Sequence, residues 1–219
     1  VMMNWQAHND TVKETGYNLV SAGWVTHVRK QFEKDTGMHF AFFQGCSGNQ
    51  AKVSRIEEEK HLNLNWIDYG HRLAKEAQNM FADLLPVQGT QIKTCQVSFE
   101  ININHDWDHL IKEANAVYDL WKTVGKPEGD ALGKTHGFTS SYQARDIRIR
   151  YEMEKTMETE LNAFSIGDLG FANSYNEVFS TVGQYVRANA PFDKVFWVTG
   201  NSRYLPCKDA YDYRSYEAD

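Results

Sequence analysis

The order of apolar segments in the first fifty or so residues restricts the fold more than any other feature of the sequence. Residues 1–5 and 38–43 are short apolar runs that predict two buried strands. Between them, Ser21 can cap a helix that continues to about Asp35, and Gly37 follows its end. The apolar face of this helix consists of Trp24, Val25, Val28 and Phe32. A strand–helix–strand order predicts a βαβ unit, and with it a sheet that is at least partly parallel.

The rest of the chain continues this mixture of helices and strands. Further helices are predicted over residues 63–85, 107–124, 139–151 and 176–188, and further strands over residues 95–103, 160–165, 169–172 and 195–198. The two strands on either side of Gly167 and Asp168 form a predicted hairpin. The sequence has no internal repeat and no linker, so we expect a single α/β domain with a mixed, partly parallel sheet and flanking helices.

Two segments carry more specific expectations. Between residues 95 and 103 apolar and polar side chains alternate strictly, which predicts a strand with one buried face and one face in solvent. After the helix that ends near Val124, the helix breakers Gly125, Pro127, Gly129 and Gly133 follow one another closely. This glycine-rich patch predicts a mobile loop that extends to Gly137.

Composition and charge exclude several classes of function. The formal net charge is −6 and lysine and arginine form no cluster, which argues against a nucleic-acid partner. No run of eighteen apolar residues exists, so no transmembrane segment is expected. The three cysteines, Cys46, Cys95 and Cys207, form no Cys-x-x-Cys pair, which excludes a thiolate zinc site. The chain opens directly on a strand at Val1, and we interpret it as lacking its natural N-terminus.

The last twenty or so residues carry the motif that suggests a family. An apolar strand over residues 195–198 is followed by Gly200 and Asn201, then by Tyr204-Leu205-Pro206, and Tyr216-Glu217 comes twelve residues after the first tyrosine. This pattern resembles the C-terminal end of the catalytic domain in the neutral, non-lysosomal ceramidase family. In that family the first tyrosine binds zinc and the second lies over the reacting centre. The resemblance therefore assigns Tyr204 to a metal site and Tyr216 to catalysis.

The same resemblance implies two further zinc ligands. Asn4-Trp5-Gln6-Ala7-His8 matches a family strand of the type Asn-Trp-x-x-His, whose histidine binds zinc. Glu177 follows the predicted Gly167-Asp168 hairpin, where the family has a zinc-binding glutamate. Without a metal, His8 would be a surface histidine at a strand end, and Glu177 an acid in the first turn of a helix, favourable to the helix dipole. Together with a phenolate, these groups suit a catalytic zinc with an open position.

The loop over residues 42–52 resembles the active-site loop of the family, which reads small-small-Gly-Asp-x-(Ser/Asn)-Pro after an apolar strand. Gly48 and Asn49 occupy the glycine and aspartate positions and join Tyr216 in the predicted catalytic set. Ala51 stands where true ceramidases place a functional serine, and Lys52 replaces the proline. These departures disfavour serine-dependent cleavage and leave attack by zinc-bound water as the chemistry that the resemblance implies.

Two main hypotheses of function follow. In the first, the chain is the C-terminal half of a ceramidase-like catalytic domain and acts as a zinc-dependent amidase on an N-acylated, lipid-like substrate. In the second, it is a non-catalytic relative with a binding or structural role, which Ala51 and Asn49 favour. An unrelated serine hydrolase using Ser47 is disfavoured because the sequence has no Gly-x-Ser-x-Gly elbow.

The resemblance also bears on partners and compartment. It implies a secreted, periplasmic or lumenal protein, and it places a further zinc-binding histidine upstream of Val1, in the N-terminal half of the domain. His105 and His109 have the spacing of helical metal ligands, but Asp106 and Asp108 between them are typical of a capped helix start.

Overall fold

The computed structural model describes residues 1–9, 20–50, 65–200 and 204–212. Contacts between residues divide the chain into two compact units, each built from two separate stretches. The first unit comprises Val1–Cys95 and Asn162–Arg203, and the second comprises Gln96–Leu161 and Tyr204–Asp219. Two strands, β3 (Ile92–Asn102) and β4 (Thr156–Ile166), continue from one unit into the other.

The first unit begins with the predicted βαβ unit. Strand β1 (Met2–Trp5) pairs in parallel with β2 (Ala41–Gln44), and α1 (Trp24–Thr36) connects them. Gly37 ends the helix at φ 70°, a conformation that glycine adopts without strain. The predicted cap at Ser21 is wrong: the helix begins later, after Gly23, and the Ser21 hydroxyl accepts a hydrogen bond from the Gly23 amide instead.

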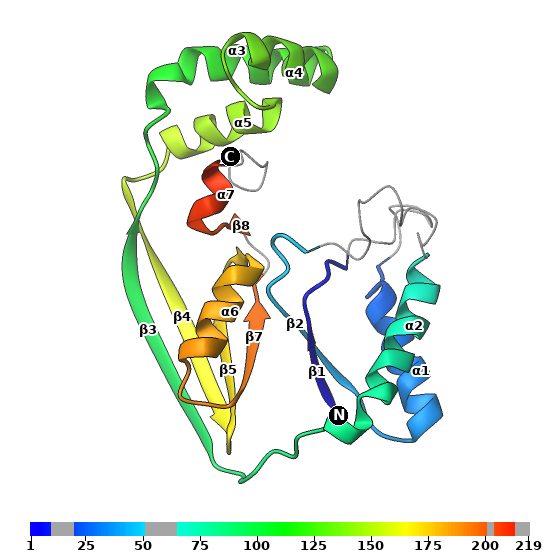
Figure 1. Ribbon diagram of the computed structural model, residues 1–219. Helices are drawn as coiled ribbons and strands as arrows, with labels where there is room; N and C mark the ends of the chain where they lie inside the picture. Colours follow the sequence, from blue (N-terminus) through cyan, green and yellow to red (C-terminus); the bar gives the residue numbers. More distant parts are fainter. Residues whose placement is uncertain (10–19, 51–64, 201–203, 213–219) are drawn as a thin grey trace. The chain divides into compact units, whose positions relative to one another are not determined.

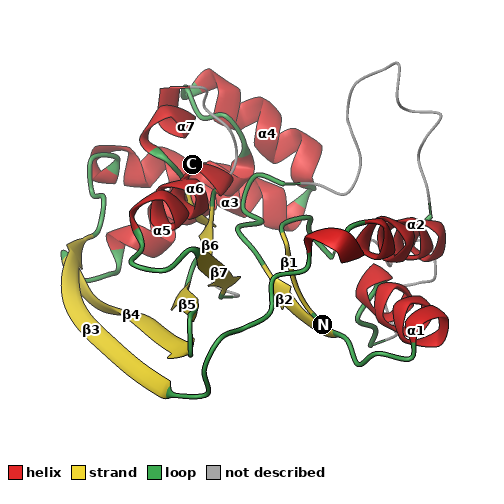
Figure 2. Cartoon of the chain, turned by 60° about the horizontal axis from the view of Figure 1, so that its bottom comes forward, coloured by secondary structure: helices red, strands yellow, loops and turns green. Residues whose placement is uncertain are grey.

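Helix α2 (Trp66–Asn79) packs along α1, and the two lie side by side in both views (Figures 1 and 2). Asn65 caps α2 by accepting hydrogen bonds from two amides of the first turn. At the crossing, a Cβ on Gly70 would lie only 2.7 Å from the Trp24 carbonyl oxygen, so the close approach requires glycine. The helix ends at Asn79, well before the predicted end at residue 85, and a short 3₁₀ turn, η3 (Phe81–Asp83), follows.

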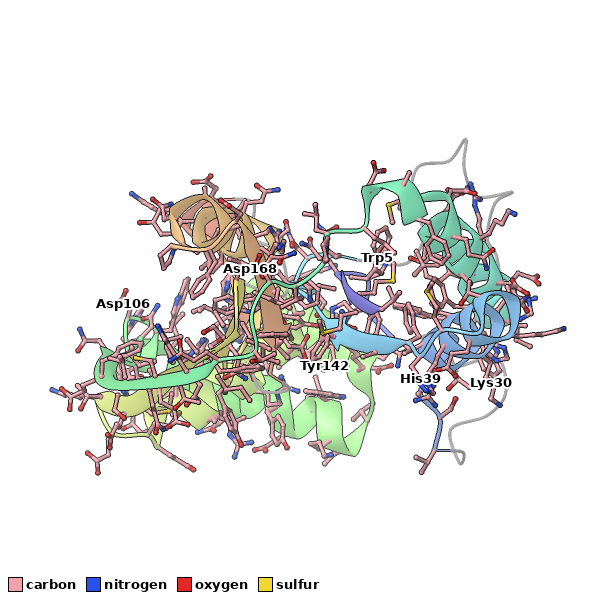
Figure 3. All side chains as sticks on the ribbon, turned by 90° about the horizontal axis from the view of Figure 1, so that it is seen from below. Trp5, Lys30, His39, Asp106, Tyr142 and Asp168 are labelled. Carbon is pink, nitrogen blue, oxygen red and sulfur yellow. The ribbon has the colours of Figure 1, made fainter. Side chains whose placement is uncertain are left out.

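Aromatic and aliphatic side chains from both helices form the core against β1. Its buried members are Met3, Ala7, Trp24, Val28, Phe32, Phe40, Leu73, Ala74 and Ala77. Trp5 lies at the end of β1, where its indole Nε1 donates a hydrogen bond of 3.1 Å to the Tyr69 hydroxyl (Figure 3).

The predicted hairpin is confirmed. Strands β4 and β5 (Leu169–Ser174) are neighbours joined by Gly167 and Asp168, and Gly167 has φ 56°. Asp168 accepts a hydrogen bond of 2.7 Å from the Gln88 amide and pairs with Lys194 (Figure 3). Strand β7 (Lys194–Thr199) pairs with β5 in parallel, giving the sheet order β3-β4-β5-β7. These pairings confirm a mixed α/β fold with partly parallel sheets.

The segment after β5 differs from expectation. The predicted helix over residues 176–188 begins only at α6 (Ser180–Asn189), and Glu177 belongs to a two-residue strand, β6 (Glu177–Val178). The interpretation of Glu177 as an acid in the first helical turn is therefore wrong.

In the second unit, three consecutive helices surround a small core. The 3₁₀ turn η4 (Asp108–Leu110) leads into α3 (Ile111–Thr123), followed by α4 (Lys126–Thr135) and α5 (Ser141–Tyr151). The buried core consists of Ala114, Val117, Phe138, Ala144 and Ile147. The last described elements are β8 (Tyr204–Leu205) and α7 (Lys208–Asp212).

The glycine-rich patch predicted as a mobile loop is helix α4. Pro127 stands in its first turn, where proline is tolerated. Gly129 is needed for packing, because a Cβ there would lie 2.7 Å from the Cβ of Trp121. The ring of Tyr142 in α5 lies 4.8 Å from the ammonium group of Lys126 (Figure 3), which also ties α4 to α5.

Strand β3 exists where alternation predicts it, but the prediction of one buried face is wrong. Val97 is 53% exposed and Phe99 is 40% exposed, although both belong to the predicted inner face. As the edge strand of the sheet, β3 has a strand on one side only. None of the helices in the described residues has the length and apolar character needed to cross a bilayer.

Candidate functional site

The ends of several strands of the first unit are held together by one polar side chain. The Nδ2 of Asn4 in β1 donates hydrogen bonds to the Phe43 carbonyl of β2, at 3.0 Å, and to the Trp197 carbonyl of β7, at 2.8 Å. Because β1 runs parallel to β2, and β5 parallel to β7, this bridge brings two parallel pairs into contact. Asn4 thus positions the segments that follow these strands.

His8 follows β1, and its backbone is fixed on both sides. Its amide donates a hydrogen bond of 3.0 Å to the Gln50 carbonyl, and its carbonyl accepts one of 3.0 Å from the indole Nε1 of Trp24. Trp24 itself is completely buried in the core, so the histidine ring leaves from a firmly held backbone.

The loop over residues 44–50 is fastened to β6 and to the start of α6. The Gly48 amide donates to the Val178 carbonyl at 3.0 Å, and a Cβ on Gly48 would lie 2.8 Å from the Glu177 carbonyl oxygen. Asn49 caps α6, because its Oδ1 accepts a hydrogen bond of 2.9 Å from the Ser180 amide. Both loop residues assigned to catalysis therefore make structural contacts beside Glu177.

Cys46, in the same loop, is fully buried against Val178 and Trp197. Burial raises the pKa of its thiol to about 11, so the group stays protonated and unreactive near neutral pH. Its role here is packing rather than chemistry.

The side chains of His8 and Glu177 lie close together. The imidazole Nε2 lies 3.7 Å from the carboxylate Oε2, and their side chains are 29% and 17% exposed. Glu177 Oε2 is buried and has no hydrogen-bond partner among the described residues. Burial raises the pKa of Glu177 above its ordinary value, against the lowering effect of His8. A buried carboxylate that lacks hydrogen-bond donors is stabilised by a nearby cation, because the positive charge replaces the missing hydrogen bonds.

The pair fits one edge of a zinc coordination sphere. Ligands of a tetrahedral zinc at bond lengths of about 2.0–2.2 Å are separated by roughly 3.3–3.6 Å. The observed 3.7 Å between Nε2 and Oε2 is close to that separation. Within the parts of the chain that the structure describes, no group of three His, Cys, Asp or Glu side chains could hold a metal ion.

The remaining predicted residues belong to β8, to the turn before α3, or to the part of the chain outside the described residues. Tyr204 is half-buried and is the first residue of β8. Tyr216 and Ala51 lie outside the described residues. His105 pairs with Asp108 at 2.9 Å, and the Nδ1 of His109 lies 2.9 Å from the Asp106 carbonyl, so both rings serve the turn that precedes α3.

Sequence reasoning missed the residues that support this pair. Asn4 was part of a motif, but its function as a bridge between sheets depends on β7, far along the chain. The signal available was a polar amide within an otherwise apolar strand, since such a group needs partners when partly buried. Nothing in the sequence pointed to the indole of Trp24 as a support for His8.

Two solved structures share this architecture over nearly the whole chain. The crystal structure of the neutral ceramidase from Pseudomonas aeruginosa matches 99% of this chain with a TM-score of 0.55 and 14% sequence identity. A ceramidase complexed with C2 matches 99% of the chain with a TM-score of 0.55 and 13% identity. The chain has a ceramidase-like fold.

The ceramidase-like fold of this chain accounts for only part of those proteins. The chain spans 40% of the first ceramidase and 41% of the second. No protein-family model matches the sequence, and no curated protein matches it either. At this level of identity the likeness concerns the ceramidase-like fold alone.

Proposed function

We propose that the chain carries part of the active site of a zinc-dependent amidohydrolase that acts on an N-acylated, lipid-like amide. The observation that carries the proposal is the juxtaposition of His8 Nε2 and Glu177 Oε2 at 3.7 Å, with the buried Oε2 lacking a hydrogen-bond partner in the described residues. The amide substrate class is suggested by the ceramidases that share the fold.

In this proposal His8 and Glu177 hold zinc. Zinc in such a site supplies a Lewis acid that activates water and polarises an amide carbonyl. The protein's part is to orient the two ligands. Hydrogen bonds to Gln50 and Trp24 fix the backbone of His8, and the Gly48 amide bond to Val178 fixes β6 next to Glu177.

Zinc affinity of the full chain tests the ligand assignment. Competition with a chromophoric chelator measures it for the wild type, for His8→Ala and for Glu177→Gln. We expect each substitution to weaken binding by at least about tenfold, since each removes one donor. His39→Ala is the matched control, because His39 is exposed on the same unit and should leave affinity unchanged. Equal affinity of His8→Ala and the wild type would refute the site.

Hydrolysis of a fluorogenic N-acyl amide tests the reaction. For a protein that joins this chain to the N-terminal half of the domain, we expect turnover that a chelator abolishes and zinc restores, and that His8→Ala removes. This chain by itself should show little or no turnover, because it carries only part of the proposed site. Turnover that survives both chelator and His8→Ala would refute zinc-dependent chemistry at this position.

One observation favours a second function, that of a non-catalytic ceramidase-fold domain with a binding or structural role. Asn49, predicted as catalytic, uses its Oδ1 to cap α6, so this atom already has a structural partner. A non-catalytic domain would bind zinc through His8 and Glu177 but turn over no acyl amide. The chelator competition and the hydrolysis assay together separate the two functions.

A further inference from the structure

An apolar pocket of about 380 Å³ lies on the face of the first unit's sheet that α6 covers. Its floor includes Gly170, Ala172 and Val195, and the end of α6 and the turn after it contribute Val186 and Phe192. Gly170 lets the Phe192 ring pack directly against the sheet, because a Cβ at this position would lie only 2.8 Å from the ring. The volume falls within the range of about 300–1,000 Å³ that is typical of small-molecule sites.

This pocket lies away from His8 and Glu177. It occupies the part of β5 and β7 where Gly170 pairs with Val195, whereas Glu177 comes after the opposite ends of these strands, where Ser174 pairs with Thr199. It also involves the end of α6, whereas Asn49 caps its start. Its ligand therefore does not depend on the proposed amidase function.

The chemistry of the lining restricts the ligand. Most lining residues are aliphatic, aromatic or glycine, and Lys93 is the only charged one. Lys93 lies on β3, is exposed, and has no ion-pair partner among the described residues. An apolar pocket beside one exposed ammonium group complements a molecule with an alkyl chain and a single negative charge.

We propose that this pocket binds a long-chain carboxylate, with its alkyl chain on the floor of Gly170, Ala172 and Val195 and its carboxylate at Lys93. Such a ligand gains affinity from each methylene group that leaves water, and the charged head stays near the surface, where Lys93 holds it. A neutral alkane or a cationic amphiphile lacks the attraction between a carboxylate and the Lys93 ammonium group.

Calorimetric titration of the full chain with octanoate, decanoate and dodecanoate, each below its micelle concentration, tests the proposal. Each added methylene should tighten binding by up to about fourfold until the pocket is full. Dodecanol and dodecyltrimethylammonium, which share the chain but not the charge, should bind more weakly than dodecanoate. Binding that is independent of chain length, or equal for the three head groups, would overturn the proposal.

Two variants with matched controls locate the site. Ala163→Trp fills the pocket from an exposed position on β4 and should abolish dodecanoate binding, whereas Ala131→Trp on α4 should not. Lys93→Glu should weaken binding by about fivefold, in line with an exposed ion pair, whereas Lys30→Glu on α1 should leave it unchanged. His8→Ala should bind dodecanoate like the wild type. Unchanged binding in Ala163→Trp, with circular dichroism confirming that it is folded, would refute the site.

Discussion

Gly183 in the interior of α6 gives the sharpest test of how the loop over residues 44–50 is held. A Cβ built on Gly183 overlaps the Sγ of Cys46 and lies 3.3 Å from the Cβ of Cys46. Cys46 is fully buried against Val178 and Trp197, so its side chain has no free space to move into. The perturbation is Gly183→Ala, which adds one methyl group at this contact.

Two opposing effects decide the sign of the change in stability. In an unhindered helix interior, replacing glycine by alanine stabilises the fold by about 0.5–1 kcal/mol. Forcing an extra methyl group into a packed core costs about 1–3 kcal/mol. Because the overlap with Sγ is severe, we expect the second effect to prevail and to leave a net loss of roughly 1–2 kcal/mol. For a chain of this size, that loss lowers the melting temperature by about 2–8 °C.

Thermal and urea unfolding measure this difference. The matched control is Gly133→Ala in α4, where the nearest atom to an added Cβ is 3.5 Å away and the substitution should be neutral or stabilising. In a Cys46→Ala background, which removes Sγ, Gly183→Ala should cost much less than in the wild type. A Gly183→Ala protein that melts at or above the wild-type temperature would refute the packing described here.

The remaining predictions concern pH. Burial raises the pKa of Glu177 above its ordinary value of 4.5, so its ionised form opposes folding. In metal-free protein, Glu177→Gln should therefore raise the unfolding free energy at neutral pH, and the gain should disappear as the pH falls below 4.5; an unchanged difference across this range in urea unfolding would contradict the assignment. Burial alone would raise the pKa of Asp130, but hydrogen bonds from Lys126 and Ser141 lower it to about 2 from 3.8. Asp130→Asn should destabilise the protein above pH 3.8, with the penalty vanishing as the pH falls towards 2; a penalty of equal size at both ends of an acid titration would show that charge is not its origin.

The strands and the hairpin could be predicted because their signals are local. Apolar runs identify β1, β2 and β7, and a Gly-Asp turn identifies the hairpin of β4 and β5. Helix α4 could not be predicted in the same way, because glycines usually indicate a loop. Here Gly129 allows the helix to pack closely, and only its contact with Trp121 in the fold reveals this. The exposure of β3 likewise depends on which elements pack against its faces, which alternation does not encode.

The candidate pair was predicted by resemblance rather than by residue chemistry. His8 and Glu177 each have an ordinary alternative role, and only the fold brings them within 3.7 Å. The cap that Asn49 provides was not predictable, because α6 begins at Ser180, which lies 131 residues further along the chain. The start of α6 was itself misplaced, so no local capping signal could lead to Asn49.

The hydrogen bond from Asn4 to Trp197 has a consequence for the order of folding. It joins residues separated by 193 positions, between a strand near the start of the sequence and one near its end. During synthesis, β1 and β2 can pair early, but their contact with β7 must wait until Trp197 has left the ribosome. Contacts of such long range close slowly because a large loop entropy is lost first. The contact between β7 and the β1–β2 pair is therefore expected to form late, and the first unit should need protection from aggregation until then.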